Sequence, residues 1–293
     1  MKSFEQKVFP YVVLFPIMVI LGVFLFWPAL NGIWISLNSW DGMNDMKFVG
    51  LNNFKDAIVD VEFREAFPRT MLWTVLSVSL DYAWALTLAL LVCARGIKGT
   101  GIIRTFFYWP AMIGGIVSAL IWKFMFGESF GLVNFLIKSA GHEPVLWFSN
   151  ATMAWVTLLS GILWGGGNHM IMLIAGIKAI PDTYYEAAEL QGANSFHKFF
   201  YITLPLLRPM SLVILVLSTL GAVRVYAGPL VMTGGGPGRA TTFMLSEIMS
   251  TAFKDFKFGL ASAMSLILFA IAIGLSLLHF QLNKGRGQED AAQ

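Results

Sequence analysis

The sequence has few charged residues and a single cysteine. Lysine, arginine, aspartate and glutamate make up 13% of the 293 residues, whereas hydrophobic side chains make up 57%. A soluble domain carries about a quarter charged residues, so this composition predicts that the bilayer is the main solvent of the chain. The net charge of +3 does not suggest a nucleic-acid partner. Cys93 cannot form an intrachain disulfide, and it leaves the redox compartment undetermined.

The sequence also lacks the motifs of an enzyme. It contains no G-x-x-x-x-G-K-[ST] phosphate loop, and the glycine-rich residues 233–239 read as a turn. His142, His169, His197 and His279 lie far apart, and none has a metal-ligand partner nearby in sequence. No pairing of a nucleophile with a base stands out. We therefore expect no catalysis, no cofactor and no metal site in this chain.

Six long apolar segments predict an all-α, polytopic membrane protein that forms a single permease-like domain over residues 1–293. The expected spans cover residues 8–37, 69–94, 105–126, 151–177, 210–232 and 258–282. Arg95, Lys98 and Arg104 crowd the short loop after the second span, and an excess of cations marks a cytoplasmic loop. Six spans then place both termini in the cytoplasm.

A polar island, residues 181–205, separates the fourth and fifth spans and is too polar to cross a bilayer. Pro181 suits the first turn of a short helix, and Gly192 suits its end. Ser195 could cap a second short helix that Pro205 would end. From these residues alone, the island is an amphipathic connector on the membrane surface. The expected topology places it in the cytoplasm.

The island also resembles the EAA loop of ABC importer permeases. The matching residues are Glu186, Ala187, Ala188, Gly192, Leu204 and Pro205. In that family the loop docks into a groove of the ATPase subunit, so the resemblance implies an ATPase-coupling role for these six residues. Small alanines would let a partner approach closely, and Glu186 would supply a polar anchor. The chain departs from the family pattern at Gln191, where aspartate is common, and one contact is therefore in doubt.

The resemblance extends to the second half of the chain. Residues 233–242, 252–253 and 258–263 are similar to the T-x-G-G-P…A-F…G-x-A-S-A pattern of carbohydrate ABC permeases. It implies an importer permease fold in the cytoplasmic membrane of a bacterium or archaeon. The implied partners are membrane lipid, a second permease, an extracytoplasmic binding protein and two ATPase subunits that bind ATP and magnesium. Residues 283–293 lack the T-A-G-A-V-like tail of one permease type, so the chain resembles the substrate-contacting permease of the maltose-type system.

Asp81 and Arg224 lie inside apolar spans, where a charge normally faces a cavity or a partner. Asp81 lies near the middle of the second span, and Arg224 lies toward the outer half of the fifth. They could form a structural ion pair, or Arg224 could snorkel to the membrane surface. The resemblance instead places Arg224 and Tyr226 on the substrate path. An arginine there would suit a hydroxyl-rich ligand, and an anionic ligand still better.

The fourth span carries a polar and glycine-rich stretch before the island. Three consecutive glycines centred on Gly166 weaken a helix and permit close approach of backbone or ligand. Trp164 offers an apolar face for a sugar ring, and Asn168 and His169 offer hydrogen bonds. The stretch is either a kinked packing interface or a substrate contact, and the resemblance favours the contact. We expect Arg224, Asn168 and His169 to face one cavity between this permease and its partner.

Two other functional classes stay open at this point. A secondary active carrier would work without an ATPase, but it usually shows internal repeat halves, which we do not detect. A membrane scaffold without transport is the third possibility. The sequence names neither the sugar nor its charge.

Overall fold

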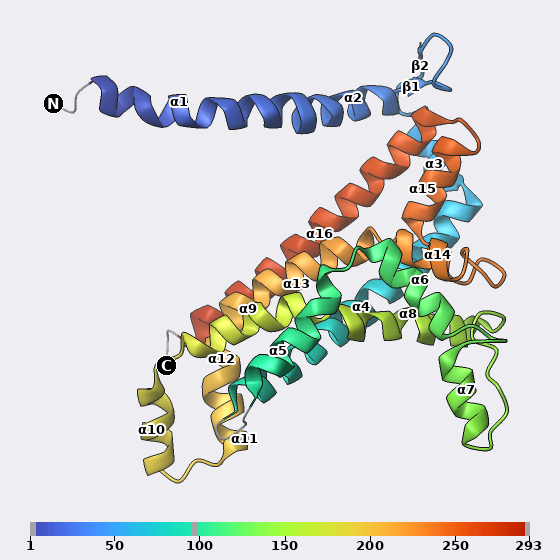
Figure 1. Cartoon of the computed structure of the whole chain (residues 1–293). Coiled ribbons are helices and arrows are strands. Elements are labelled where there is room, and N and C mark those ends of the chain that lie inside the picture. The colour runs from blue at the N-terminus through green and yellow to red at the C-terminus, as the bar shows by residue number, and fades with distance from the viewer. Residues whose placement is uncertain (1–3, 95–98, 291–293) are drawn as a thin grey trace. The chain divides into compact units, whose positions relative to one another are not determined.

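The structure, a computed structural model, describes residues 4–94 and 99–290 and is almost entirely helical (Figure 1). The predicted all-α class is therefore confirmed. Arg95 and Lys98, on which the expected cytoplasmic loop depends, lie outside the described residues.

The described residues contain sixteen α-helices joined by short irregular segments. They are α1 (Phe4–Leu21), α2 (Trp27–Ser36), α3 (Asn52–Val59), α4 (Val61–Cys93), α5 (Thr100–Tyr108), α6 (Gly115–Met125), α7 (Leu132–Ser139), α8 (Ala151–Gly165), α9 (Gly167–Lys178), α10 (Asp182–Leu190), α11 (Ser195–Lys198), α12 (Leu204–Leu206), α13 (Arg208–Val223), α14 (Ala227–Met232), α15 (Met244–Phe253) and α16 (Phe258–Asp290). Residues Gly22–Phe26 and Phe199–Thr203 form π-helical turns, and Trp109–Met112 form a 3-10 turn.

Three helical stretches are long and apolar enough to cross a bilayer alone: Phe9–Ser36, Val61–Cys93 and Phe258–Asn283. Three bent helix pairs also qualify if each pair counts as one span, which gives up to six spans, as expected. The bends measure 103° between the α5 and α6 segments, 46° between α8 and α9, and 67° where α12 meets α13. The fifth expected span is interrupted, because α13 ends at Val223 and α14 begins only at Ala227.

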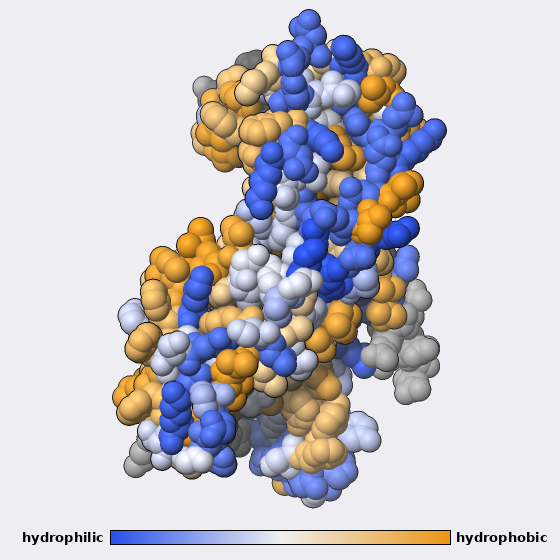
Figure 2. All heavy atoms as spheres, turned by 90° about the vertical axis from the view of Figure 1, so that its right-hand side faces the viewer, coloured by the Kyte–Doolittle hydropathy of each residue, from blue (hydrophilic) through white to orange (hydrophobic). Residues whose placement is uncertain are grey.

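Contacts group the chain into two compact units. Unit 1 comprises Met1–Arg64 and Glu247–Phe269, and unit 2 comprises Glu65–Ser246 and Ala270–Gln293. Large apolar side chains are exposed in both units, and Figure 2 shows broad apolar areas on the face that it presents. Exposed apolar area on this scale is typical of a surface that meets lipid or partner subunits.

Unit 1 contains the only β-structure among the described residues, a two-stranded antiparallel sheet of β1 (Asn38–Ser39) and β2 (Lys47–Phe48). The buried Asn53 side chain on α3 donates hydrogen bonds to the carbonyl oxygens of Ser36 (2.8 Å) and Asn38 (2.9 Å). A Cβ atom at Gly259 would collide with the Asn38 carbonyl oxygen. The glycine at this position therefore lets the start of α16 pack closely against the backbone of β1.

Unit 2 has its main apolar core where α4, α9 and α13 meet. The fully buried side chains there are Ala85, Leu88, Ala89, Met170, Leu173, Leu207 and Ile214. Alanines on α4 let the neighbouring backbones approach closely, which favours helix association in lipid. A second cluster packs Trp73 of α4 against Phe243, with ring centroids 5.5 Å apart, and Trp155 of α8 lies beside both.

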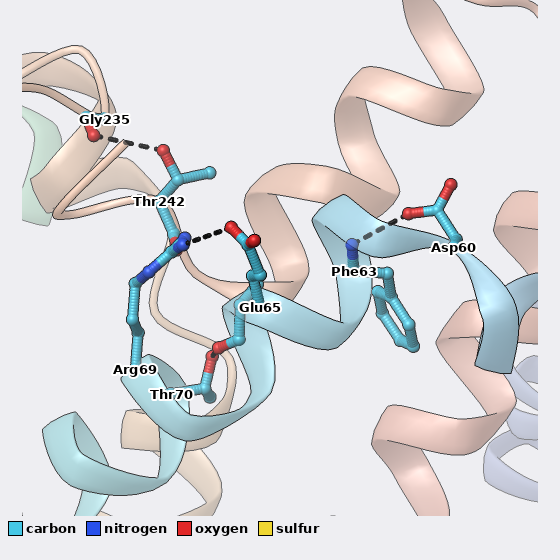
Figure 3. A network of polar contacts seen from close by, with 8 residues as sticks. Asp60, Phe63, Glu65, Arg69, Thr70, Gly235 and Thr242 are labelled. Carbon is cyan, nitrogen blue, oxygen red and sulfur yellow. Dashed lines mark hydrogen bonds and ion pairs between the residues drawn. The ribbon is translucent and has the colours of Figure 1, made fainter. Parts of the chain in front are cut away.

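The glycine-rich loop after α14 is held to the start of α4 (Figure 3). The Thr242 hydroxyl donates to the Gly235 carbonyl (3.1 Å), and Arg69 donates to the Thr242 carbonyl (3.3 Å). Arg69 also forms an ion pair with Glu65 at 3.1 Å. The Thr70 hydroxyl accepts a hydrogen bond from the backbone N–H of Met244 at 3.0 Å. These contacts make the loop an ordered part of unit 2.

Candidate functional site

The first helix of the polar island, α10, begins at Asp182 and ends as the glycine predicts. Gly192 has φ +79°, a conformation that costs glycine little and other residues more. Its N–H donates to the Glu189 carbonyl (3.0 Å), and the Ala193 N–H donates to the Ala188 carbonyl (2.9 Å). This pair of bonds is the Schellman motif, which satisfies carbonyl groups at a helix C-terminus.

The second half of the island differs from the prediction at both ends. The cap is Asn194, whose side-chain oxygen accepts from the His197 N–H at 2.9 Å, so Ser195 is the first helical residue instead. Pro205 does not end the helix, because it lies in the first turn of α12, where a missing N–H is tolerated. The chain turns only at Leu207 and then continues as α13.

Two side-chain contacts hold the halves of the island together. Lys198 of α11 forms an ion pair with Glu189 of α10 at 2.8 Å. The Tyr185 hydroxyl lies 3.0 Å from the hydroxyl of the buried Thr203. Figure 1 shows α10 and α11 side by side at the ends of α9 and α12. The island is therefore a folded helical hairpin, which we call the coupling segment (residues 181–205) after the role that the resemblance implies.

The residues that carry the EAA resemblance are accessible on this segment. Glu186, Ala187 and Gly192 are exposed, while Ala188, Leu204 and Pro205 are half-buried. The segment also exposes large apolar side chains that sequence reasoning missed: Leu190 at 90%, Tyr201 at 77% and Phe196 at 68%. Their signal was present in the sequence, since large apolar residues inside a polar island need a partner surface.

Asp81 lies at the junction of three helices. Its Oδ2 atom accepts a hydrogen bond from the Ser218 hydroxyl of α13 at 2.7 Å, and it lies 2.8 Å from His169 Nδ1 of α9. The side chains of Asp81 and His169 are 15% and 21% exposed. Next to Asp81, the Tyr82 hydroxyl lies 2.7 Å from the hydroxyl of Ser211 on α13. The two helices that flank the coupling segment, α9 and α13, are therefore both bonded to α4.

Arg224 does not take part in this cluster, so the ion-pair alternative between Arg224 and Asp81 is wrong. Arg224 follows the last residue of α13, is exposed, and donates from Nε to the Leu220 carbonyl of its own helix at 2.9 Å. Ser218 and His169 instead contact the Asp81 carboxylate, both through its Oδ2 atom. Tyr226 precedes α14 and is half-buried.

The three glycines divide their roles at the break between α8 and α9. Gly166 packs against the Trp84 ring, where an added Cβ would lie 2.8 Å from Cδ1. A Cβ at Gly167 would collide with the Phe107 carbonyl oxygen, whereas one at Gly165 would meet nothing within 4 Å. Gly166 and Gly167 therefore serve helix packing, whereas Gly165 lines a cavity; the substrate contact stays a prediction.

Two cavities lie beside this break in unit 2. The first, about 290 Å³, we call the tryptophan cavity, and its lining includes Trp73, Ser118, Trp122, Trp164, Asn168 and Gly228. The second, about 310 Å³, we call the Asp81 cavity, and its lining includes Trp73, Ser77, Asp81, His169, Ser218 and Gly221. Trp73, Ile162 and Val225 line both cavities, so the two are neighbours.

The proposed path residues are distributed over these cavities unevenly. Asn168 lines the tryptophan cavity and His169 lines the Asp81 cavity, while Arg224 and Tyr226 line neither. Within the described part of this single chain, the three residues expected to share one cavity therefore do not. Trp164 Nε1 is buried with no hydrogen-bond partner among the described residues. A buried donor of this kind is costly unless a ligand or water accepts from it.

A family model described as "Binding-protein-dependent transport system inner membrane component" matches residues 83–287. The matched range includes the coupling segment and most residues of both cavities, among them His169 and Ser218. It excludes Asp81, which lies two residues before the start of the match.

Similar proteins include a trehalose/maltose transport system permease protein, MalF, from Thermococcus litoralis, 33% identical over 97% of this chain and 96% of the relative. An sn-glycerol-3-phosphate transport system permease protein, UgpA, from Rhizobium meliloti is 30% identical over 97% of each chain. Among solved structures, a bacterial ABC transporter involved in import of the acidic polysaccharide alginate matches with a TM-score of 0.84 at 20% identity, over 96% of each chain. That match shows the same fold.

Proposed function

Because the chain belongs to the family of inner membrane components of binding-protein-dependent transport systems, we propose that it is the permease subunit of an ATP-driven carbohydrate importer. The observation that carries this proposal is the family match over residues 83–287, which includes an exposed, folded coupling segment. The names of its relatives add the cargo class, since trehalose, maltose and glycerol phosphate are all small hydroxyl-rich molecules. The chain would act in the cytoplasmic membrane of a bacterium or archaeon.

The coupling segment would dock to a separate ATPase subunit, which binds ATP and magnesium. Glu186 and Ala187 are exposed for this contact, and the exposed Leu190, Phe196 and Tyr201 offer apolar anchors. Large aromatic and aliphatic side chains of this kind dominate binding energy at interfaces. The ion pair and the helix cap that stiffen the hairpin would let it move as one body, so that motion of the ATPase reaches α9 and α13.

The two cavities would form this chain's share of the substrate path, completed by a second, related permease. Trp73, Trp122 and Trp164 present apolar ring faces, which suit the C–H faces of a sugar. Asn168 lies beside them, and the unpartnered Trp164 Nε1 would donate to a hydroxyl. An extracytoplasmic binding protein would deliver the cargo, and alternating access would release it inside.

Reconstitution tests this function directly. Vesicles that contain this chain, its paired permease and two ATPase subunits should accumulate cargo only with ATP inside and loaded binding protein outside. Vesicles that contain this chain alone should neither hydrolyse ATP nor accumulate solute. Robust uptake by the single chain under a proton or sodium gradient would instead support a secondary active carrier.

A further inference from the structure

The two cavities differ sharply in charge. Among the described residues, those lining the tryptophan cavity carry no ionisable side chain. The Asp81 cavity is lined by the Asp81 carboxylate and by His169. A carboxylate at 15% exposure inside an apolar span is costly to retain, so its position next to a cavity requires a physical account.

Only one oxygen atom of the Asp81 carboxylate has hydrogen-bond partners among the described residues. Oδ2 receives both contacts, from Ser218 and from His169, and no hydrogen bond within the described residues reaches Oδ1. The hydroxyl of Ser218 donates, which keeps Oδ2 an acceptor. The Asp81 carboxylate therefore contributes a hydrogen-bond acceptor to the wall of the cavity that it lines.

The cation expected on the substrate path, Arg224, lines neither cavity. It is exposed and bonded to the carbonyl of Leu220, although its neighbour Val225 lines both cavities. Among the described residues, neither cavity is lined by a lysine or arginine side chain that would attract an anion.

We propose that Asp81 makes this chain's share of the path selective for uncharged, hydroxyl-bearing cargo and against anionic cargo. The proposal rests on the proposed function, since it assumes that cargo passes along these cavities. It goes beyond family membership, because the named relatives include a trehalose/maltose permease and a glycerol-phosphate permease, one for neutral and one for anionic molecules.

The chemistry follows from the groups on the cavity wall. A sugar hydroxyl can donate to a carboxylate oxygen in a charge-assisted hydrogen bond, about twice as strong as a neutral one. A phosphate or uronate group is negatively charged at neutral pH and is repelled by the same oxygen. At contact distances of about 4 Å, below the screening length of about 8 Å at physiological ionic strength, salt screens this repulsion only in part.

Charge-selective labelling tests the proposal without knowledge of the cargo. In a Cys93→Ser background, Gly221→Cys places a thiol in the Asp81 cavity, and Gly228→Cys places one in the tryptophan cavity. Both glycines have open space where a Cβ would stand, so both variants should fold. The complete importer in vesicles is treated with neutral hydroxyethyl methanethiosulfonate or anionic sulfonatoethyl methanethiosulfonate, and modification rates are read by mass spectrometry.

The measured quantity is the neutral-to-anionic rate ratio at each site, divided by the same ratio for free cysteine. Because both reagents attack the same thiolate, any effect of Asp81 on thiol ionisation cancels in this ratio. We expect the ratio for Gly221→Cys to exceed that for Gly228→Cys by at least about fivefold, the size expected for one nearby like charge. Adding Asp81→Asn should reduce it toward the value for Gly228→Cys.

Equal ratios at the two sites would overturn the proposal even if the Asp81→Asn variant failed to assemble. So would an Asp81→Asn variant with an unchanged ratio, or failure of both reagents to reach Gly221→Cys. Coupled uptake measured in the same vesicles keeps the two ideas apart. If uptake needs ATP and binding protein while the ratios are equal, the importer function stands and the charge selectivity fails.

Discussion

Replacing Gly192 with proline should disconnect the importer from its ATPase. Proline holds φ near about −65°, whereas this position has φ +79°. Proline also removes the N–H that donates to the Glu189 carbonyl, and it disfavours the helical conformation of the preceding residue. The last turn of α10 should therefore unwind, and that turn carries the Ala188 carbonyl of the EAA sequence.

The expected loss of ATPase affinity can be estimated from the two hydrogen bonds of the helix cap. Each of the Gly192–Glu189 and Ala193–Ala188 hydrogen bonds contributes about 0.5–1.5 kcal/mol, so their loss costs about 1–3 kcal/mol of local stability. If docking requires the folded turn, this cost is subtracted from the binding free energy. Affinity for the ATPase should then fall by about five- to 150-fold.

The matched control is Gly141, at the end of α7. Gly141 has φ +85°, and its N–H and that of His142 make the same pair of cap bonds, to Lys138 (3.0 Å) and Ile137 (3.1 Å). Neither glycine has an atom within 4 Å of where its Cβ would stand. The assay is retention of the ATPase subunits on purified, membrane-inserted permease, followed by ATP hydrolysis with loaded binding protein.

Gly192→Pro should lose the ATPase subunits, while Gly141→Pro should keep them at the wild-type level. Equal loss in both variants would indicate a general folding defect. A well-assembled Gly192→Pro importer with normal coupled transport would refute the docking role of the segment.

Three further predictions concern unit 2. Arg224→Gln should keep most transport of a neutral cargo, and Arg224→Ala should leave assembly of the complex intact. If Arg224→Ala instead impaired assembly and an added Asp81→Asn restored it, the two side chains would form the ion pair that the structure lacks. Gly167→Ala should lower the melting temperature of the purified protein by a few degrees, because overpacking costs about 1–3 kcal/mol, while Gly165→Ala should leave it unchanged. Desolvation raises the pKa of Glu128, but hydrogen bonds from Phe148 and Ser149 outweigh it and leave the pKa below the ordinary 4.5. The ionised Glu128 carboxylate therefore stabilises the folded connection of residues 128–149 above pH 4.5, and this stabilisation is lost as the pH falls through the lowered pKa. Protection of residues 128–149 from hydrogen exchange should therefore fall on acidification, and it should fall less in Glu128→Gln.

The coupling segment shows how much local sequence can predict. Its first helix and the glycine cap follow from Pro181 and Gly192, because capping depends on residues within one turn of each other. The second helix shows where local signals compete. Asn194 and Ser195 are both good caps, and the structure uses Asn194 because its side chain can reach the His197 N–H.

Composition and the apolar pattern along the chain were enough to predict the helical class and the apolar stretches, and the resemblance of short motifs indicated the family. The partners of Asp81 follow only from the tertiary structure. Asp81 is 88 residues from His169 and 137 residues from Ser218. A carboxylate in an apolar span needs donors, but several side chains could supply them, and only the crossing of α4, α9 and α13 selects these two and leaves Arg224 outside.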